Sequence, residues 1–336
     1  MMLIKNNIPD VATLHNRLES VLESGLTEFL EHTKDRRSKV YANVKFVLVS
    51  VFFFVAIWVF ISVFLLSIGT GMTFQIAVAL SIIWAAILLV SSRSWLRNTR
   101  LLAREVNMAL TPTFSAVFDR LFLYTHNGEK AKRVKQLLTE SSLLTTEGLW
   151  VTADDSFEVF SGEQKTEFHE VLVSMREPKG GTGRDAVETE IFRGMLMVTK
   201  LGIQHQAETY ISTDGDRHGF AHQSFWTVVL GMSKVKTTEL EWNDFEQVLH
   251  VASTDGRAAR EFLSPEVMQD VYEWWQEHKL NMRIAIKHDR LYLLLPEAKT
   301  RIEASTASAK LSEIVKYAKT LARPIWRGLV LADDVA

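Results

Sequence analysis

The chain has 336 residues, a formal net charge of −2 and no cysteine. Without cysteine it forms no disulfide and offers no thiolate nucleophile or thiolate metal ligand. The 38 basic and 40 acidic side chains are nearly balanced. A dedicated nucleic-acid-binding domain instead carries clustered Lys and Arg. We therefore expect no nucleic-acid partner.

An amphipathic helix is expected near the N-terminus, from a cap at Asp10 to about Thr33. Its apolar positions recur at helical spacing, at Val11, Leu14, Leu18, Leu22, Leu26 and Phe29. Two interpretations stay open. The helix packs on its own soluble domain, or it pairs with a second chain as a coiled coil. Gly25 interrupts the stripe and weakens the coiled-coil interpretation.

Two long apolar runs follow this helix. Residues 46–68 contain no charged side chain, and a glycine-containing turn at residues 69–73 joins them to a second run over residues 74–90. About 20 apolar residues in a helix cross the hydrocarbon core of a bilayer, so we expect a two-span transmembrane hairpin. Basic side chains flank both runs, whereas the turn has none. The positive-inside rule then places both termini and the soluble domain in the cytoplasm of a bacterial inner membrane.

Short helices are expected after the second run. One ends near Leu110, and Thr111-Pro112 has the pattern of a cap and first residue for a helix that continues through Phe122. A further helix is predicted over residues 129–141. Its basic side chains form either a solvated face or a contact with anionic lipid headgroups.

From about residue 143 the apolar period changes to two, which is typical of strands. Strands are predicted over parts of residues 149–160, split at Asp154-Asp155, and over residues 168–175, 191–199 and 208–212. The glycine-rich loop at residues 177–185 lacks the spacing of a phosphate-binding loop. Asp255 and Ser264-Pro265 are typical helix starts. Residues 282–295 predict a hairpin that turns at His288-Asp289, and a last helix over residues 308–322 should stop before Pro324.

The predicted fold class is an α+β cytoplasmic domain, an antiparallel sheet with packed helices, attached to an α-helical two-span transmembrane hairpin. The expected domains are an N-terminal amphipathic helix (1–43), the transmembrane hairpin (44–92), juxtamembrane helices (93–142), the α+β domain (143–300) and a C-terminal helix and tail (301–336).

Several short motifs follow one another along the chain: Ile191-Phe192-Arg193-Gly194, Asp244-Phe245-Glu246 with His250-Val251, Thr254-Asp255 with Ala258-Ala259-Arg260, Leu263-Ser264-Pro265, and Leu291-Tyr292-Leu293. Together with the predicted membrane hairpin they resemble a bacterial membrane family of unknown function, DUF3137. The resemblance covers roughly residues 35–300 and is strongest over 240–295. It implies a membrane-tethered α+β domain and no established reaction. It also suggests a LemA-type membrane protein as a partner. The motif residues have a structural explanation as well, with Asp255 and Ser264 as caps and Phe245 and Leu263 as core.

Candidate site residues fall into two groups. Carboxylates and imidazoles that could bind a divalent metal gather at Asp214, Asp216, His218 and His222. A ligand or partner surface is assigned to Arg193, Arg217, Arg260 and Trp275. No catalytic residue is assigned, because the zincin and nucleophile-elbow patterns are absent. A serine–histidine–acid triad assembled from distant residues stays open.

The sequence therefore favours a non-enzymatic, membrane-anchored interaction or scaffold module. Its expected partners are the lipid bilayer and either a second copy of the chain or another membrane protein, and no cofactor is expected. One alternative is a membrane-tethered receptor for a small anionic ligand, which needs Arg193, Arg217 and Arg260 in one pocket. A second alternative is a metal-dependent hydrolase built around Asp214 to His222.

Overall fold

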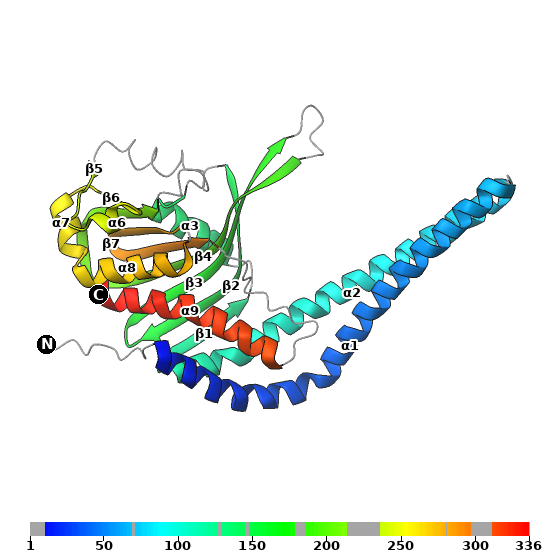
Figure 1. Ribbon diagram of the computed structural model, residues 1–336, viewed down its shortest axis with the longest axis horizontal. Helices are drawn as coiled ribbons and strands as arrows, with labels where there is room; N and C mark the ends of the chain where they lie inside the picture. The colour runs from blue at the N-terminus through cyan, green and yellow to red at the C-terminus, as the bar shows by residue number, and fades with distance from the viewer. Residues whose placement is uncertain are drawn as a thin grey trace. The chain divides into compact units, whose positions relative to one another are not determined.

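The structure, a computed structural model, describes residues 11–68, 71–126, 130–144, 148–178, 186–213, 236–279, 281–296 and 311–335 (Figure 1). Side chains of some residues within α1 and α2, including 60–80, are not described. The chain divides into two compact units. One comprises residues 1–18, 111–302 and 318–336, and the other comprises residues 19–110 and 303–317. We describe each unit separately.

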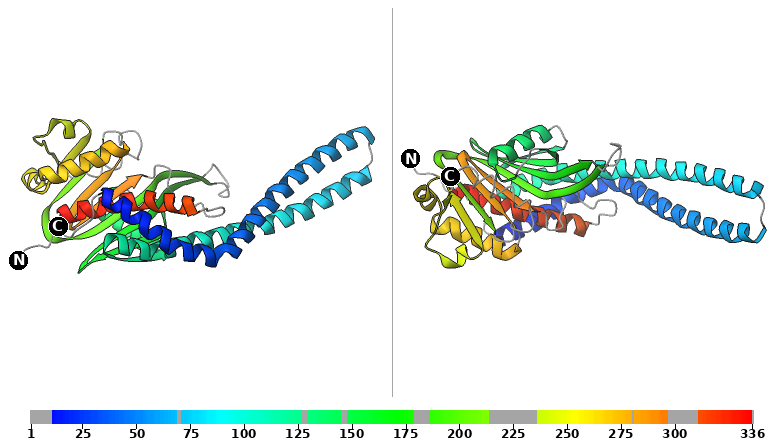
Figure 2. Two further views of the ribbon diagram at one scale, coloured as in Figure 1. Left: turned by 60° about the horizontal axis from the view of Figure 1, so that its bottom comes forward. Right: turned by 90° about the horizontal axis from the view of Figure 1, so that it is seen from above.

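The second unit is built on two long helices, α1 (Val11–Ile68) and α2 (Gly71–Phe118), which run side by side (Figures 1 and 2). Apolar side chains of both helices are buried at the end of the pair opposite residues 68–71. Among them are Leu22, Leu26, Leu102 and Val106. Arg36 forms an ion pair with Glu105 across the pair. The helix expected to end at Thr33 is thus the first part of one continuous helix.

The transmembrane part of the fold prediction requires a correction. A helix needs about 20 apolar residues to cross a bilayer. Over the residues that the structure describes, none of the helices combines that length with that apolar character. The predicted two-span transmembrane hairpin at residues 44–92 is therefore not supported.

The first unit holds a seven-stranded sheet whose paired strands are all antiparallel. This confirms the α+β part of the prediction. The strand order is β1-β2-β3-β4-β6-β5, and β7 pairs with β4. The bounds of these strands are β1 Leu121–His126, β2 Leu149–Ser161, β3 Gln164–Pro178, β4 Ala186–Thr213, β5 Lys236–Thr237, β6 Leu249–Ser253 and β7 Arg283–Pro296.

Helices cover both faces of this sheet (Figure 1). On one face, α3 (Ala131–Ser141) packs Val134, Leu137 and Leu138 against a core that includes Val171 and Leu196. On the other face, Gly328 of α9 (Leu311–Val335) lies against Phe168 and Met197. Consecutive strand residues point to opposite faces. The neighbours Leu196 and Met197 therefore lie on different faces of the sheet, Leu196 on the face covered by α3 and Met197 on the face covered by α9.

The predicted helix starts in the last third of the chain are confirmed. Asp255 accepts hydrogen bonds from the main-chain N–H groups of Arg257 and Ala258 and caps α7 (Gly256–Phe262). Ser264 accepts one from Val267 and caps α8 (Pro265–His278), with Pro265 in its first turn. A short helix, α6 (Asn243–Glu246), precedes β6 and buries Phe245.

Four element boundaries differ from the sequence prediction. Proline does not interrupt the helices as expected, since Pro112 lies inside α2 and Pro324 inside α9. The residues from Leu121 form strand β1 instead of a helical turn. His288 adopts a positive φ of 56°, yet residues 283–296 form a single strand that pairs along β4.

Candidate functional site

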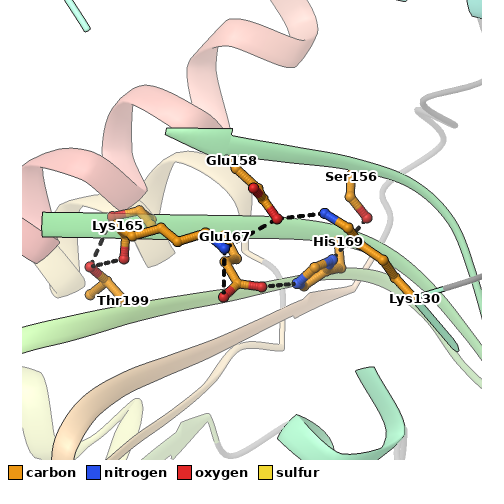
Figure 3. A network of polar contacts seen from close by, with 8 residues as sticks. Lys130, Ser156, Glu158, Lys165, Glu167, His169 and Thr199 are labelled. Carbon is orange, nitrogen blue, oxygen red and sulfur yellow. Dashed lines mark hydrogen bonds and ion pairs between the residues drawn. The ribbon is translucent and has the colours of Figure 1, made fainter. Parts of the chain in front are cut away.

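The sheet face covered by α3 carries a connected group of polar side chains on β2 and β3 (Figure 3). We call Ser156, Glu158, Glu167, His169, Lys165 and Lys130 the polar network. The strand register places Ser156 opposite His169 and Glu158 opposite Glu167. The two strands therefore bring these four side chains together on one face.

His169 lies at the centre of the network. Its Nδ1 atom is 2.8 Å from Ser156 Oγ, and its Nε2 atom is 3.1 Å from Glu167 Oε2. The hydrogen bond from His169 and the positive charge of Lys165 lower the pKa of Glu167 to about 2, against the opposing effect of burial. Glu167 is thus held as a carboxylate, the form that only accepts hydrogen bonds.

Two lysines complete the network. Lys130 Nζ lies 2.6 Å from Glu158 Oε1, and Lys165 Nζ lies 3.2 Å from the same oxygen and 3.4 Å from Glu167 Oε1. Burial would raise the pKa of Glu158, but the hydrogen bonds and charges of the two lysines outweigh it and lower the pKa. Two carboxylates therefore face two ammonium groups and one imidazole.

The chemistry of the network follows from its burial. Serine, histidine and glutamate are joined in the order of a catalytic triad, the arrangement that the sequence left open. However, His169 is 0% exposed and Ser156 is 2% exposed. A nucleophile must reach its substrate, and this hydroxyl is enclosed by the protein. The network joins β2 to β3 and presents no nucleophile to solvent.

A second polar cluster lies where β2 departs from regular pairing. The register of β2 against β3 shifts between Ala153 and Ser156, which makes Asp154-Asp155 a β-bulge. Potential ligand atoms of His126, Asp154 and Asp155 all lie within 4.8 Å of one another. Asp155 Oδ1 is 2.8 Å from His126 Nδ1 and accepts a 2.6 Å hydrogen bond from the Tyr124 hydroxyl. We call His126, Asp154 and Asp155 the bulge cluster.

The residues predicted as a metal site, Asp214, Asp216, His218 and His222, lie outside the described residues, as does Arg217. Their roles stay predictions. Arg193 contacts Glu190 at 2.8 Å on its own strand, and Arg260 donates to the main-chain carbonyl of Glu239 at 3.2 Å. The two described arginines thus have different partners.

Trp275, the remaining predicted surface residue, lies on α8 and is half-buried. The Lys279 ammonium sits 3.8 Å from the centre of its ring, and the Tyr272 ring lies 6.1 Å away. The indole of Trp275 thus packs between one residue that precedes it and one that follows it in the sequence. Its role as a partner surface stays a prediction.

Most of the large apolar side chains that are exposed in the described chain lie on the paired helices. Half-buried or buried residues recur every three or four positions, at Val47, Ser50, Phe54 and Trp58 of α1 and at Ser81, Trp84 and Leu88 of α2. We call the exposed large apolar side chains the apolar belt. They are 43–70% exposed and comprise Phe46, Leu48, Val49, Val51, Phe52, Phe53, Val55, Ile57, Val59, Ile82, Ile83, Ile87, Leu89 and Val90.

Sequence reasoning missed both polar clusters on the sheet. The sequence pattern predicts a break between strands at Asp154-Asp155, whereas these residues form a bulge inside β2. His169 lies in the predicted strand 168–175, and Glu167 directly precedes that strand. In a strand, a spacing of two residues places both side chains on the same face. That spacing was the available signal, but their partner Ser156 comes from a different strand.

Comparison with known proteins agrees with the motif evidence. Residues 190–324 match the family DUF3137, described as a protein of unknown function. The family predicted from the motifs is confirmed over this segment. The DUF3137 match contains Phe192, Gly194, Phe245 and both helix caps. It includes neither β2 nor β3, the two strands that carry most of the polar network.

The remaining comparisons add little. Among curated proteins, no sequence matches this chain. One solved structure, the mycobacterial trehalose monomycolate transport factor A, TtfA, is similar at 10% sequence identity. The similarity covers 66% of this chain and 94% of that one, with a TM-score of 0.33. A likeness of this size supports no conclusion about fold or function.

Proposed function

We propose that this chain is a membrane-associated interaction module. The apolar belt contacts lipid, and the α+β unit presents a surface to a protein partner or to a second copy of the chain. The observation that carries the proposal is the apolar belt, with its 14 exposed large apolar side chains on two paired helices. Contiguous exposed apolar surface of this kind marks protein or membrane interaction sites.

Lipid is the occupant that fits the belt best. Val51, Phe52 and Phe53 are consecutive in a helix and therefore point in different directions, yet all three are at least 43% exposed. A helix that docks on one protein face has a polar side opposite its apolar stripe. The described belt residues surround the helix more broadly than such a stripe, and lipid chains can cover an apolar surface from several directions.

Charge at one end of the belt supports the same assignment. Lys45 directly precedes the belt on α1, and Arg93 and Arg97 follow it on α2, all with exposed side chains. Because the helices run side by side as a hairpin, these three cations lie toward the same end of the pair. Basic side chains next to an apolar surface bind anionic lipid headgroups, each contributing about 1 kcal/mol.

The proposed location is the bacterial inner membrane. The protein partner is a second copy of the chain or another membrane protein, such as a LemA-type protein. The half-buried Trp275 beside Lys279 is the part of the α+β unit that we assign to this contact, since tryptophan is enriched at binding hot spots. Mass measurement of full-length protein in mild detergent tests this part, and a monomer with no co-purifying protein would contradict it.

Flotation with lipid vesicles tests lipid contact. Full-length protein should rise with vesicles that contain anionic lipid. Serine in place of Phe52, Phe53, Val55 and Ile57 should leave most of the protein at the bottom of the gradient. The matched control replaces Leu121 and Leu123 with serine, because these leucines are also exposed (56% and 44%) but lie on β1. Equal flotation of the belt variant and the control would refute lipid contact through the belt.

A further inference from the structure

We propose that the bulge cluster, His126 with Asp154 and Asp155, binds a divalent first-row transition-metal cation of the Mn²⁺ or Zn²⁺ type. The cluster shares no residue with the apolar belt or with the segment from Asp214 to His222. It combines one imidazole with two carboxylates, all within 4.8 Å of one another. The inference does not depend on the proposed function.

The chemistry of the ligands selects the class of ion. Imidazole suits zinc, copper, iron and nickel, whereas carboxylates suit manganese, magnesium and calcium. A set with one nitrogen and two carboxylate ligands falls between these preferences. It fits Mn²⁺ or Zn²⁺ better than Ca²⁺ or Mg²⁺, which bind oxygen ligands.

The distances fit a single ion. Metal–ligand bonds of about 2.1 Å at right angles separate neighbouring ligand atoms by about 3 Å, and opposite ligands by about 4.2 Å. His126 Nδ1 and Asp155 Oδ1 lie 2.8 Å apart, close to the separation of neighbouring ligands. The ligand atom of Asp154 lies within 4.8 Å of the other two, and its side chain is exposed, so it has room to approach an ion held by the pair.

The fold explains how two consecutive aspartates reach one point. In a regular strand, side chains i and i+1 point to opposite faces. The β-bulge at Asp154-Asp155 breaks this alternation, and β1 supplies His126 directly opposite Asp155. Tyr124, two residues before His126, donates its hydroxyl to Asp155 Oδ1 at 2.6 Å. Such an outer hydrogen bond orients a metal ligand.

The three ligands differ in exposure. The exposed ligand can meet an ion that arrives from solvent, and the buried ligand is held in a fixed position. The Asp155 side chain is 5% exposed and the His126 side chain 26% exposed, whereas Asp154 lies at the surface. An ion arriving from solvent would meet Asp154 first and then the fixed pair behind it. Its binding would join β1 to the bulge of β2, near the edge of the sheet formed by β1.

Equilibrium dialysis of full-length protein against Mn²⁺ alone and Zn²⁺ alone, followed by metal analysis, tests the site. We expect one ion per chain. Asp154→Asn and His126→Ala should abolish its retention, and Tyr124→Phe should weaken it by about 10- to 100-fold. Asp154→Asn is the decisive variant because Asp154 is exposed, so the substitution should leave folding intact. Circular dichroism checks this.

The matched controls separate this site from other acidic positions. Glu163→Gln, at an exposed position in the turn after β2, should retain the ion. A double variant with Asp216→Ala and His218→Ala should also retain it. Absence of a bound ion would overturn the proposal. Retention of the ion by Asp154→Asn, or its loss in the Asp216/His218 variant alone, would also overturn it.

Discussion

Gly194 of β4 lies so close to the main-chain carbonyl of Leu295 on β7 that a β-carbon at this position would overlap the carbonyl oxygen and carbon. The Phe192 ring would also lie 2.8 Å from that carbon. Gly194 closes the Phe192-Arg193-Gly194 motif of the matched segment. The glycine of this motif thus has a steric explanation in the pairing of β4 with β7.

Replacing Gly194 with alanine should therefore destabilise the α+β unit. The neighbouring atoms are main-chain atoms, which yield only if the two strands separate, so we expect a loss of about 3 kcal/mol or more. Urea unfolding of the full-length protein measures the effect. Gly256→Ala is the matched control, because an added methyl group there meets only side-chain atoms, those of Thr238 at 3.4 Å and Arg260 Nη1 at 4.0 Å. A Gly194→Ala protein as stable as this control would contradict the explanation.

Ser156→Ala should leave His169 Nδ1 buried without its hydrogen-bond partner. The expected loss is about 1–3 kcal/mol in the free energy of unfolding, the usual cost of an unsatisfied buried polar group. Thr152→Val, an exposed position on the same strand, should change stability by about 0.5 kcal/mol or less. A double-mutant cycle with His169→Phe should show coupling between Ser156 and His169. Additive effects would contradict a shared network.

Stability in acid should depend on Glu167. The pKa of this carboxyl falls to about 2 in the folded protein from its ordinary value of 4.5. The unfolded chain therefore binds the proton more tightly, and Glu167 contributes stability above about pH 4.5 that is lost as the pH falls toward 2. Urea midpoints measured from pH 2 to pH 6 should fall less steeply for Glu167→Gln than for wild type. Parallel curves would show that Glu167 is not the group responsible.

Asp270 should have the opposite effect. Burial first, and then a hydrogen bond and charge repulsion from Asp334, raise its pKa to about 6, while Arg327 acts to lower it. The folded protein thus holds a proton that the unfolded chain releases. Its contribution to stability is complete below about pH 4 and is lost as the pH rises through about 6.

Asp270→Asn tests this assignment. The variant should lose less stability than wild type between pH 4 and pH 7, as measured by urea unfolding. Glu261→Gln is the control, since Glu261 lies in an exposed ion pair with Arg257. If the stability of wild type and of Asp270→Asn changes equally over this range, Asp270 does not titrate as described.

Local signals predicted local features well. Asp255 and Ser264-Pro265 cap their helices because capping depends only on residues within one turn. Phe245 and Leu263 are core residues, as their motif setting indicated. The α+β class followed from the change of apolar period near residue 143.

The features that the sequence did not predict depend on pairing between strands that are distant in the sequence. Asp154-Asp155 and His288-Asp289 have the composition of turns, but the neighbouring strands β3 and β4 pair on both sides of them, so each lies inside one strand. Leu121 and Phe122 continue a helical apolar pattern, yet pairing with Phe160 and Val159 makes them part of a strand. The polar network needed the register of β2 against β3, which no local pattern supplies.

A polarity-sensitive dye on the apolar belt tests lipid contact most directly. The chain has no cysteine, so Phe53→Cys provides a single labelling position on a side chain that is 55% exposed. Glu163→Cys provides the matched position in the turn after β2. When full-length protein meets vesicles with anionic lipid, emission from position 53 should shift to shorter wavelength, and emission from position 163 should not change. An unchanged spectrum at position 53 in protein that has bound the vesicles would contradict lipid contact through the belt.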